Sequence, residues 1–374
     1  MKHLVLILVL ALTAKVAHAY PQFQLSRDQT CSSCHLDPAG GGLLSEAGDA
    51  FVETNSQFGQ NAKFFYDKLK LPDWLTLGGD ARAAAGYVRT PQQYLDAFPM
   101  QLDVYGSAKL PKHLRLTVTV GYRPPQQGNE AATTIWSREH YLLWSSEDSA
   151  RDGWFVRVGR FMPIFGLRYA EHPTYTRQYG GTTLYTETYG AAVEYITEKY
   201  EAHLTGFIKD PLIDPVAHDN GGALYAEYRL AKNASVGAEG MYTKSDLDSK
   251  LRGGLTGKYY ASGPDLLLQF EGQVVNQKVD SYGITQLVGQ LTATKFLPAS
   301  TWIDLGIGHY DENVRVDGLD RDALDLNAHW LATSHVELFL TTRLELINNG
   351  RTQPNNLGAP PTGAYALLQL HYRL

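Results

Sequence analysis

The only two cysteines of the 374-residue chain stand in one five-residue motif, Cys31-Ser32-Ser33-Cys34-His35. C-x-x-C-H is the pattern of c-type haem attachment. In this chemistry both thiols form thioethers with the vinyl groups of the porphyrin, and the adjacent imidazole binds the iron. Two residues between the cysteines place both sulfur atoms at one edge of the macrocycle, and the next position brings His35 beneath the iron. The motif therefore predicts one covalent haem c with His35 as the proximal ligand.

Three other interpretations of the cysteine pair fit the surrounding residues less well. A thioredoxin-type redox pair belongs to a βαβ unit, and this segment shows no such pattern. A zinc site needs four ligands, whereas residues 20–72 contain no Cys or His beyond Cys31, Cys34 and His35. A disulfide is compatible with an exported protein and stays an alternative to haem attachment.

The distal ligand of the iron has no candidate near the motif. Met and His are the common distal partners, and residues 20–72 hold neither apart from His35. Beyond Met1 the chain has three methionines, Met100, Met162 and Met241, and each is a weak candidate whose competing role is ordinary packing. An iron with one protein ligand is the other possibility.

The first nineteen residues have the features of a secretory signal. Lys2 precedes an apolar run over residues 4–12, and residues 17–19 read Ala-His-Ala, the small-x-small pattern cleaved by signal peptidase. We therefore expect a signal peptide at 1–19 and a mature chain that begins at Tyr20. Removal of this segment leaves 31 basic and 39 acidic residues, a net charge of −8. That balance excludes a basic nucleic-acid-binding protein.

The segment around the motif is too small to fold alone. A glycine run at 40–42 is followed by Leu43, Leu44, Ala47 and Phe51 at helical spacing, which predicts one short helix. A second short helix is expected over residues 62–70, before Pro72. About fifty residues with two short helices fall below what an independent core needs. The haem segment at 20–72 must therefore gain burial from haem and from the following domain.

From Trp74 onward the hydrophobic pattern has a period of two. Near the C terminus Ala366, Leu368 and Leu370 alternate with Gln369 and His371, so one face is apolar and the other largely polar. A membrane β-strand takes 9–11 residues with lipid-facing and lumen-facing positions in alternation. About sixteen such segments begin near residues 74, 99, 113, 136, 154, 184, 199, 222, 234, 252, 264, 282, 300, 322, 336 and 363. The prediction is an all-β fold, an antiparallel outer-membrane β-barrel of about sixteen strands over residues 73–374.

The connections between these segments alternate in length. Short ones at 110–113, 230–233 and 261–264 are interspersed with long ones around 122–135, 161–183, 208–221, 310–321 and 347–362. Outer-membrane barrels have short periplasmic turns and long extracellular loops, so an even strand number places both termini in the periplasm. Aromatic residues near segment ends fit interfacial girdles: Trp74, Tyr87, Tyr122, Trp136, Trp144, Trp302, Tyr310, Trp330 and Tyr372. A soluble β-sandwich is the alternative, but no helices are expected to cover sixteen apolar faces.

The order of these elements resembles a known family. Tyr20-Pro21-Gln22-Phe23, a single C-x-x-C-H, a glycine-rich stretch, a short helix and a barrel are the layout of the fused monohaem cytochrome-porins of the outer membrane. The resemblance implies electron transfer across that membrane between an extracellular donor, with ferrous iron as one candidate, and a periplasmic carrier. Residues 42–51 depart from the Pro-rich, Phe-Gly pattern of the iron oxidases in this family. Residues 159–166 resemble a segment of polyanion-type porins.

The dimensions of a membrane barrel lead to a structural expectation for the haem segment. An apolar band about 25 Å tall separates the compartments, so a redox centre must lie within it for an electron to cross. We expect residues 20–72 to plug the lumen. Inward cations could pair with plug acids and haem propionates: Arg82, Lys109, Arg115, Arg157, Arg229, Lys258, Arg343 and Arg373.

Two long loops contain groups suited to ferrous iron. They are Asp210, Asp214, His218 and Asp219 in one loop, and His309, Asp311, Glu312, Asp317 and Asp320 in or beside the other. Solvated loop surface is the competing explanation. Two further functions stay open, a solute-diffusion porin with an accessory haem and a small haem peroxidase. No Ser-His-Asp spacing, phosphate-binding loop or zinc-hydrolase motif indicates a hydrolase.

Overall fold

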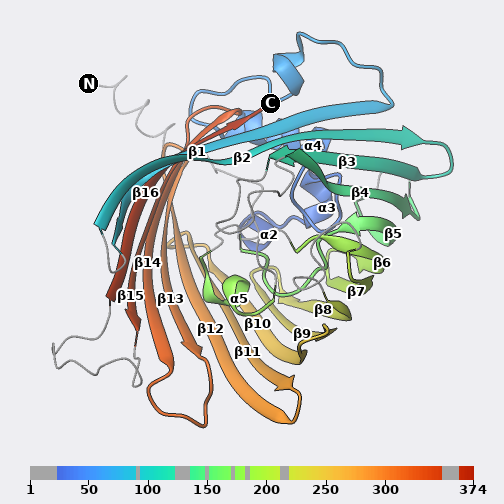
Figure 1. Ribbon diagram of the computed structural model, residues 1–374. Helices are drawn as coiled ribbons and strands as arrows, with labels where there is room; N and C mark the ends of the chain where they lie inside the picture. The colour runs from blue at the N-terminus through green and yellow to red at the C-terminus, as the bar shows by residue number, and fades with distance from the viewer. Residues whose placement is uncertain are drawn as a thin grey trace, which may run out of the picture.

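The computed structural model describes residues 23–89, 93–122, 135–147, 151–169, 173–181, 186–210, 219–347 and 362–374. The proposed signal peptide at 1–19 lies outside these residues. Sixteen antiparallel strands form a closed barrel in which every strand pairs with its sequence neighbours and β1 pairs with β16 (Figure 1). The strands are β1 Leu75–Arg89, β2 Gln93–Leu110, β3 Leu114–Tyr122, β4 Ile135–Ser145, β5 Gly153–Phe161, β6 Thr188–Ile196, β7 Tyr200–Ile208, β8 Asn220–Ala231, β9 Ala234–Lys244, β10 Ser249–Ala261, β11 Leu266–Val279, β12 Tyr282–Leu297, β13 Thr301–Asp311, β14 Asp320–Leu331, β15 Val336–Ile347 and β16 Thr362–Arg373. The predicted sixteen-stranded barrel is confirmed.

The outer surface of the barrel is apolar and its lumen is polar. On β14, Leu324 and Leu326 are about half exposed and point outward, whereas Asp325 and Asn327, which alternate with them, are buried. Similar outward apolar side chains occur on other strands, among them Leu102, Leu204, Leu255, Leu305 and Leu368. A closed barrel satisfies all backbone hydrogen bonds and can therefore present this surface to lipid. The architecture is that of an outer-membrane-type barrel.

The prediction of an aromatic girdle is correct for some residues and wrong for others. Trp74, Tyr87 and Trp144 are exposed at strand ends, as lipid-interface residues should be. Trp302 is fully buried and Tyr310 nearly so, so their assignment to the girdle was wrong. Both share the inward register of Asp304 on β13 and pack against segments inside the barrel.

The helices are short and lie mainly in the N-terminal segment. They are α2 Phe23–Ser26, α3 Cys31–Cys34, α4 Glu46–Asn55 and the 3-10 helix η1 Phe64–Asp67, with α5 Tyr175–Gln178 in the β5–β6 connection. Figure 1 shows α2, α3 and α5 inside the ring of strands. None of the helices in the described residues is long and apolar enough to cross a membrane.

Both helices expected after the haem motif differ from the prediction: the first begins later, and the second is shorter. The first was expected to include Leu43 and Leu44, but α4 begins only after Ser45, whose Oγ accepts a hydrogen bond from the Gly48 N–H at 3.1 Å. The second contracts to η1. Phe65 and Tyr66 adopt positive φ angles there, which prevents a regular helix.

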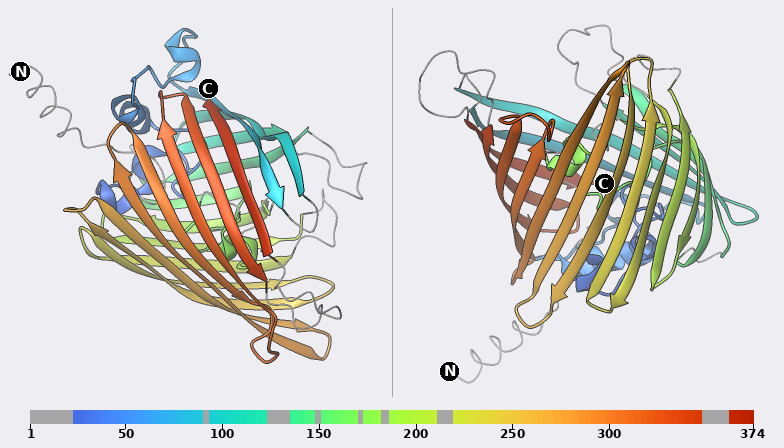
Figure 2. Two further views of the ribbon diagram at one scale, coloured as in Figure 1. Left: turned by 90° about the vertical axis from the view of Figure 1, so that its left-hand side faces the viewer. Right: turned by 90° about the horizontal axis from the view of Figure 1, so that it is seen from below.

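The N-terminal segment, residues 23–72, enters the barrel at the end that carries both termini of the sheet. Its backbone pairs with the β14–β15 turn through Gln57 N–H to Leu331 O and Phe58 N–H to Ala332 O, both at 3.0 Å. At the same end Tyr66 Oη lies 3.4 Å from Tyr372 Oη, and η1 is close to the C terminus in Figure 2 (left). This is also the end with short turns. The longer connections, after β3, β5, β7, β13 and β15, are at the opposite end.

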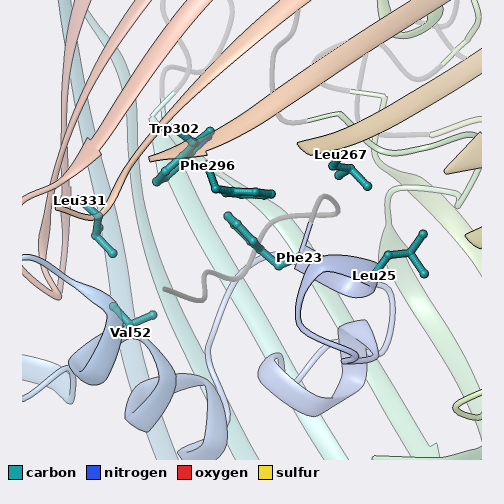
Figure 3. Close-up of a cluster of buried hydrophobic side chains, with 7 residues drawn as sticks. All are labelled: Phe23, Leu25, Val52, Leu267, Phe296, Trp302 and Leu331. Carbon is teal, nitrogen blue, oxygen red and sulfur yellow. The ribbon is translucent and has the colours of Figure 1, made fainter. Parts of the chain in front are cut away.

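A hydrophobic cluster fixes the segment to the barrel wall. Phe23 lies between the segment and β12–β13, with ring centroids 5.4 Å from Phe296 and 5.8 Å from Trp302 (Figure 3). The remaining buried members are Leu25, Val52, Leu267 and Leu331. Residues 23–72 therefore obtain their core from the barrel, and we call this segment the plug.

Candidate haem site

The haem motif forms one turn of helix. Thr30 precedes α3 and its Oγ1 lies 2.7 Å from Ser33 Oγ, a polar contact that caps the turn. The His35 N–H donates to Cys31 O at 3.0 Å. Residues three apart in a helical turn share a face, so Cys31 and Cys34 lie on the same side of α3.

The segment after the motif is held against it by backbone contacts. Leu36 N–H donates to Leu43 O at 3.0 Å, and Ser45 N–H donates to Cys34 O at 2.9 Å. Helix α4 then passes so close that a Cβ at Gly48 would overlap the Cys34 carbonyl oxygen. A side chain larger than hydrogen at Gly48 would thus separate α4 from the haem motif.

The glycine run forms an open loop beside the cysteines. Gly40, Gly41 and Gly42 have φ angles of +89°, +87° and +58°, a conformation that favours glycine. A Cβ at Gly40 would lie 3.6 Å from Cys31 Sγ, in ordinary contact with the atom that would carry the porphyrin. The run keeps this side of the motif free of side chains.

A cavity of about 400 Å³ lies between the plug and the barrel wall. Cys31, Cys34 and His35 line it together with the glycine run. Apolar contributions come from both sides: Leu43, Leu44 and Phe51 in the plug, and Met162, Ile164 and Phe165 in the β5–β6 connection. Its volume is in the range of pockets that hold small molecules and cofactors. The donor set, the cradle of glycines and the apolar lining fit a haem c.

The cavity is also rich in guanidinium groups. Among the described residues six arginines line it, Arg82, Arg138, Arg157, Arg168, Arg177 and Arg373, beside five carboxylates, Asp37, Asp80, Asp103, Glu139 and Glu187. Guanidinium groups bind carboxylates in a bidentate geometry. A porphyrin with two propionates would therefore meet cationic partners on this wall.

Several of these arginines attach the motif loop to the barrel. Arg157 donates to Asp37 Oδ2 at 2.6 Å, which also accepts from Tyr141 Oη at 3.0 Å, and Arg157 pairs with Glu194 at 2.5 Å. Arg168 donates to Ala39 O at 2.8 Å. The contacts of Asp37 and Ala39 join residues more than 100 positions apart in the sequence and hold the loop that follows His35.

The eight cations expected to face the plug have different roles. Arg157 pairs with Asp37, and Arg229 pairs with Asp28 at 3.1 Å, while Lys258 donates to Gln24 Oε1. Arg82 and Arg373 line the cavity. The other three act elsewhere: Arg115 donates to Ser107, Arg343 pairs with Asp325, and Lys109 is exposed.

The environment of the thiols differs from that of a redox-active pair. Burial raises the pKa of the Cys31 thiol to about 11 and raises the pKa of Cys34 as well. Reactive cysteines of the thioredoxin type have lowered pKa values. The two thiols are free in the structure, and burial favours their neutral form.

Comparison with known proteins reveals similarity in structure alone. No protein-family model and no curated protein matches the sequence. Among solved structures, OmpT of Vibrio cholerae has a TM-score of 0.62 at 11% identity and covers 82% of this chain and 100% of its own. An anion-selective porin from Comamonas acidovorans has a TM-score of 0.60 at 15% identity, with 80% and 99% coverage. Pseudomonas putida OprB has a TM-score of 0.59 at 10% identity, with 80% and 94% coverage. The barrel is porin-like.

Inside this porin-like barrel, one of the three candidate methionines lies in the same cavity as the haem motif. Met162 lines the same cavity as His35. Met241 is buried in a cluster with Phe165 and Phe207. Met100, on β2, is not among the residues that line the cavity. Packing thus accounts for Met241, and Met162 is the candidate for the distal position.

The expected ferrous-iron ligands do not converge in the described residues. Asp214 and His218 lie outside them. Asp210 is buried in an ion pair with Arg160 at 2.8 Å, so its expected role as an accessible loop ligand was wrong. His309 pairs with Asp322 at 2.9 Å on the exposed surface. The described part of the chain contains no group of three or more His, Cys, Asp or Glu that could hold a metal ion.

Sequence reasoning missed three arginines of the site, Arg138, Arg168 and Arg177. Arg138 pairs with Asp103 at 2.6 Å and with Glu187 at 2.7 Å. It sits at a register shift between β3 and β4, where simple alternation no longer predicts which residues face the lumen. Arg168 belongs to the β5–β6 connection, in which no periodic pattern indicates direction. A polar residue at a bulge is the signal that could have identified Arg138.

Proposed function

We propose that this chain is an outer-membrane cytochrome-porin that moves electrons between an extracellular donor and a periplasmic carrier through one covalent haem c. The observation that carries this proposal is the cavity inside the porin-like barrel, because C-x-x-C-H and the barrel wall line it jointly. A barrel of this type belongs in the outer membrane of a bacterium, with its short turns and both termini in the periplasm and its long loops outside.

Each group of residues has a defined task in this proposal. Cys31 and Cys34 would hold the porphyrin through thioethers, and His35 would be the proximal ligand, with Met162 as candidate for the distal position. Haem c supplies, when bound, one-electron transfer at a potential set by its axial ligands and surroundings. The motif lines the cavity between the plug and the barrel wall, and Arg82 and Arg373 would offer positive charge to propionates.

The location of the motif supports passage through the membrane. Helix α3 lies inside the ring of strands (Figure 1), and the cavity is lined by mid-strand residues such as Arg82 of β1 and Tyr141 of β4. A redox centre at this depth shortens the distance across the apolar band from either side. Ferrous iron is the donor implied by the resemblance to cytochrome-porins, and it would act as substrate from the outer side.

Reconstitution in liposomes tests the proposal. Purified protein is inserted into vesicles that enclose a soluble cytochrome c, and an impermeant reductant is added outside. We expect reduction of the enclosed cytochrome with the wild-type protein and loss of that reduction with Cys31→Ser/Cys34→Ser, which retains the barrel. Mass spectrometry of the same samples reports whether the wild-type chain carries one porphyrin.

Four results would contradict the proposal. A mature chain that carries no porphyrin would show that the proposed cofactor is absent. Equal reduction by wild type and the double variant would show that electrons pass without the haem motif. Conductance in planar bilayers as large as that of an open porin would favour solute diffusion, and peroxide turnover far above that of a free haem peptide would favour a peroxidase.

A further inference from the structure

A continuous row of carboxylates and imidazoles follows the inner wall beside the cavity; Asp80 at its end is half-buried and the other members are buried. Asp80 Oδ1 lies 2.6 Å from His371 Nε2, and His371 Nδ1 lies 3.2 Å from Glu337 Oε2. Glu337 Oε1 lies 2.9 Å from His329 Nδ1, and His329 Nε2 lies 3.3 Å from Asp304 Oδ2. The five residues come from five consecutive strands of the barrel, β1, β16, β15, β14 and β13. We call this row the wall relay.

The wall relay has a cavity at each end. Asp80 and His371 line the main cavity beside the haem motif. At the other end Asp304 accepts a hydrogen bond from Thr294 Oγ1 at 2.6 Å, and both residues line a second cavity of about 20 Å³. Such a volume has room for about one water molecule. The row therefore connects the proposed haem site with a separate polar pocket of the lumen.

The middle of the wall relay is closed to bulk water. Glu337 is 2% exposed and His329 is 1% exposed. The His329 ring is stacked between Trp302 at 4.5 Å and Phe339 at 3.8 Å. Both imidazoles have a carboxylate at each ring nitrogen, so either ring can accept a proton on one nitrogen and release one from the other. Each ring nitrogen of the row therefore lies within 3.3 Å of a carboxylate oxygen, with no intervening water needed.

The charged groups around the row determine how many protons its carboxylates and imidazoles bind. Arg373 Nη2 lies 3.3 Å from Glu337 Oε2, and Tyr105 of β2 donates to Asp80 Oδ2 at 2.6 Å. Other charged groups facing it are Arg82 of β1, the Asp103–Arg138 pair of β2 and β4, and the Asp325–Arg343 pair beside the second cavity. Three carboxylates of the row are balanced by Arg373 only when both imidazoles are protonated.

We propose that the wall relay couples the arrival of an electron at the haem site to the uptake of one proton. This inference rests on the proposed function. An oxidised haem carries one more positive charge than a reduced haem, and a nearby positive charge disfavours the uptake of a proton by the wall relay. One electron from an external one-electron donor therefore draws one proton from water into the row, and both leave when the electron passes to the acceptor. The net charge of the site stays constant through the cycle.

The midpoint potential of the purified holoprotein, measured by spectroelectrochemistry between about pH 5 and pH 8, tests the coupling. One proton per electron makes the wild-type potential fall by up to about 59 mV per pH unit, since each unit is a tenfold change in proton activity. His371→Gln and His329→Gln each remove one imidazole and should reduce this slope to less than half. His309→Gln is the matched control, because His309 also pairs with an aspartate but lies on the exposed surface.

The outcomes separate this inference from the proposed function. A chain without haem overturns both. A holoprotein whose potential is independent of pH overturns the wall relay and leaves the cytochrome-porin proposal intact. A pH-dependent wild type with the same slope in both variants places the proton acceptor elsewhere and also overturns it. Resistance of the barrel to unfolding in detergent verifies that each variant is folded, and the imidazole NMR titration of Cys31→Ser/Cys34→Ser, with and without His371→Gln, identifies the titrating ring without haem.

Discussion

Replacement of Phe23 by alanine should release the plug from the barrel wall. Phe23 is 2% exposed and packs on Phe296 and Trp302. A buried Phe→Ala change costs about 3–5 kcal/mol, because apolar contact is lost and a void remains. Residues 23–72 have little other core, so most of this cost falls on the equilibrium between the docked and the undocked plug.

Phe58 offers a control of the same chemistry in the same segment. It is 67% exposed, so Phe58→Ala removes about a third of the contact and should cost about 1 kcal/mol. The difference between the two variants is then about 3 kcal/mol, which corresponds to a ratio on the order of 100 in the population of undocked plug.

Hydrogen exchange followed by mass spectrometry measures that population, since amides of α2, α3 and α4 exchange through opening of the plug. We expect peptides over residues 23–58 to exchange on the order of 100-fold faster in Phe23→Ala than in Phe58→Ala, with unchanged exchange in β5–β12. Equal exchange in the two variants would refute the view that burial of Phe23 fixes the plug.

Four further changes have defined outcomes. Arg157→Gln leaves the buried carboxylates of Asp37 and Glu194 without their shared cation, which should destabilise the docked plug by about 3–5 kcal/mol in the same exchange assay. Gly40→Ala places a side chain at a φ of +89° and beside Cys31 Sγ and should lower the yield of haem-loaded protein in mass spectra, whereas Gly263→Ala, at an open position, should not. Burial, and then the Glu53 carboxylate, raise the pKa of Asp49 to about 6. The folded plug therefore binds this proton more tightly than the unfolded chain, and the stability of the plug should fall as pH rises from about 4 to 6. The Tm of the Asp49→Asn variant should show no such fall. Met162→Ala should alter the optical spectrum of the oxidised haem, and an unchanged spectrum would exclude Met162 as a ligand.

The strand pattern could be predicted because lipid imposes it. Every second residue of a membrane strand must be apolar, which makes Leu324 and Leu326 recognisable without a structure. The same rule fails where the sheet is irregular, as at the β3–β4 register shift that turns Arg138 into the lumen. It also fails for Trp302, because an aromatic residue near a strand end has the same local sequence whether it faces lipid or the plug.

The haem motif could be predicted because its chemistry is local. Five consecutive residues contain both thiols and the imidazole, whereas the rest of the site comes from distant parts of the chain. Asp37 and Arg157 are 120 positions apart, and the wall relay joins Asp80 to His371 across 291 positions. The first contact follows from docking of the plug against β5 and the second from the closure of β1 on β16, and no short segment of the sequence encodes either.

The division of the site between plug and barrel links cofactor loading to folding. In the proposed holoprotein the plug would supply the thiols and the proximal imidazole, while the barrel and the β5–β6 connection would supply Met162, the guanidinium groups and the wall relay. A segment of about fifty residues cannot build a core of this size alone, so an undocked plug would leave the motif in water. Loading before docking would then present a solvent-exposed haem, and docking would place it among the arginines. The order of these two steps is therefore measurable in the Phe23→Ala protein. Haem attached in full to an undocked plug means that attachment comes first, and a loss of haem in proportion to undocking means that the barrel completes the site.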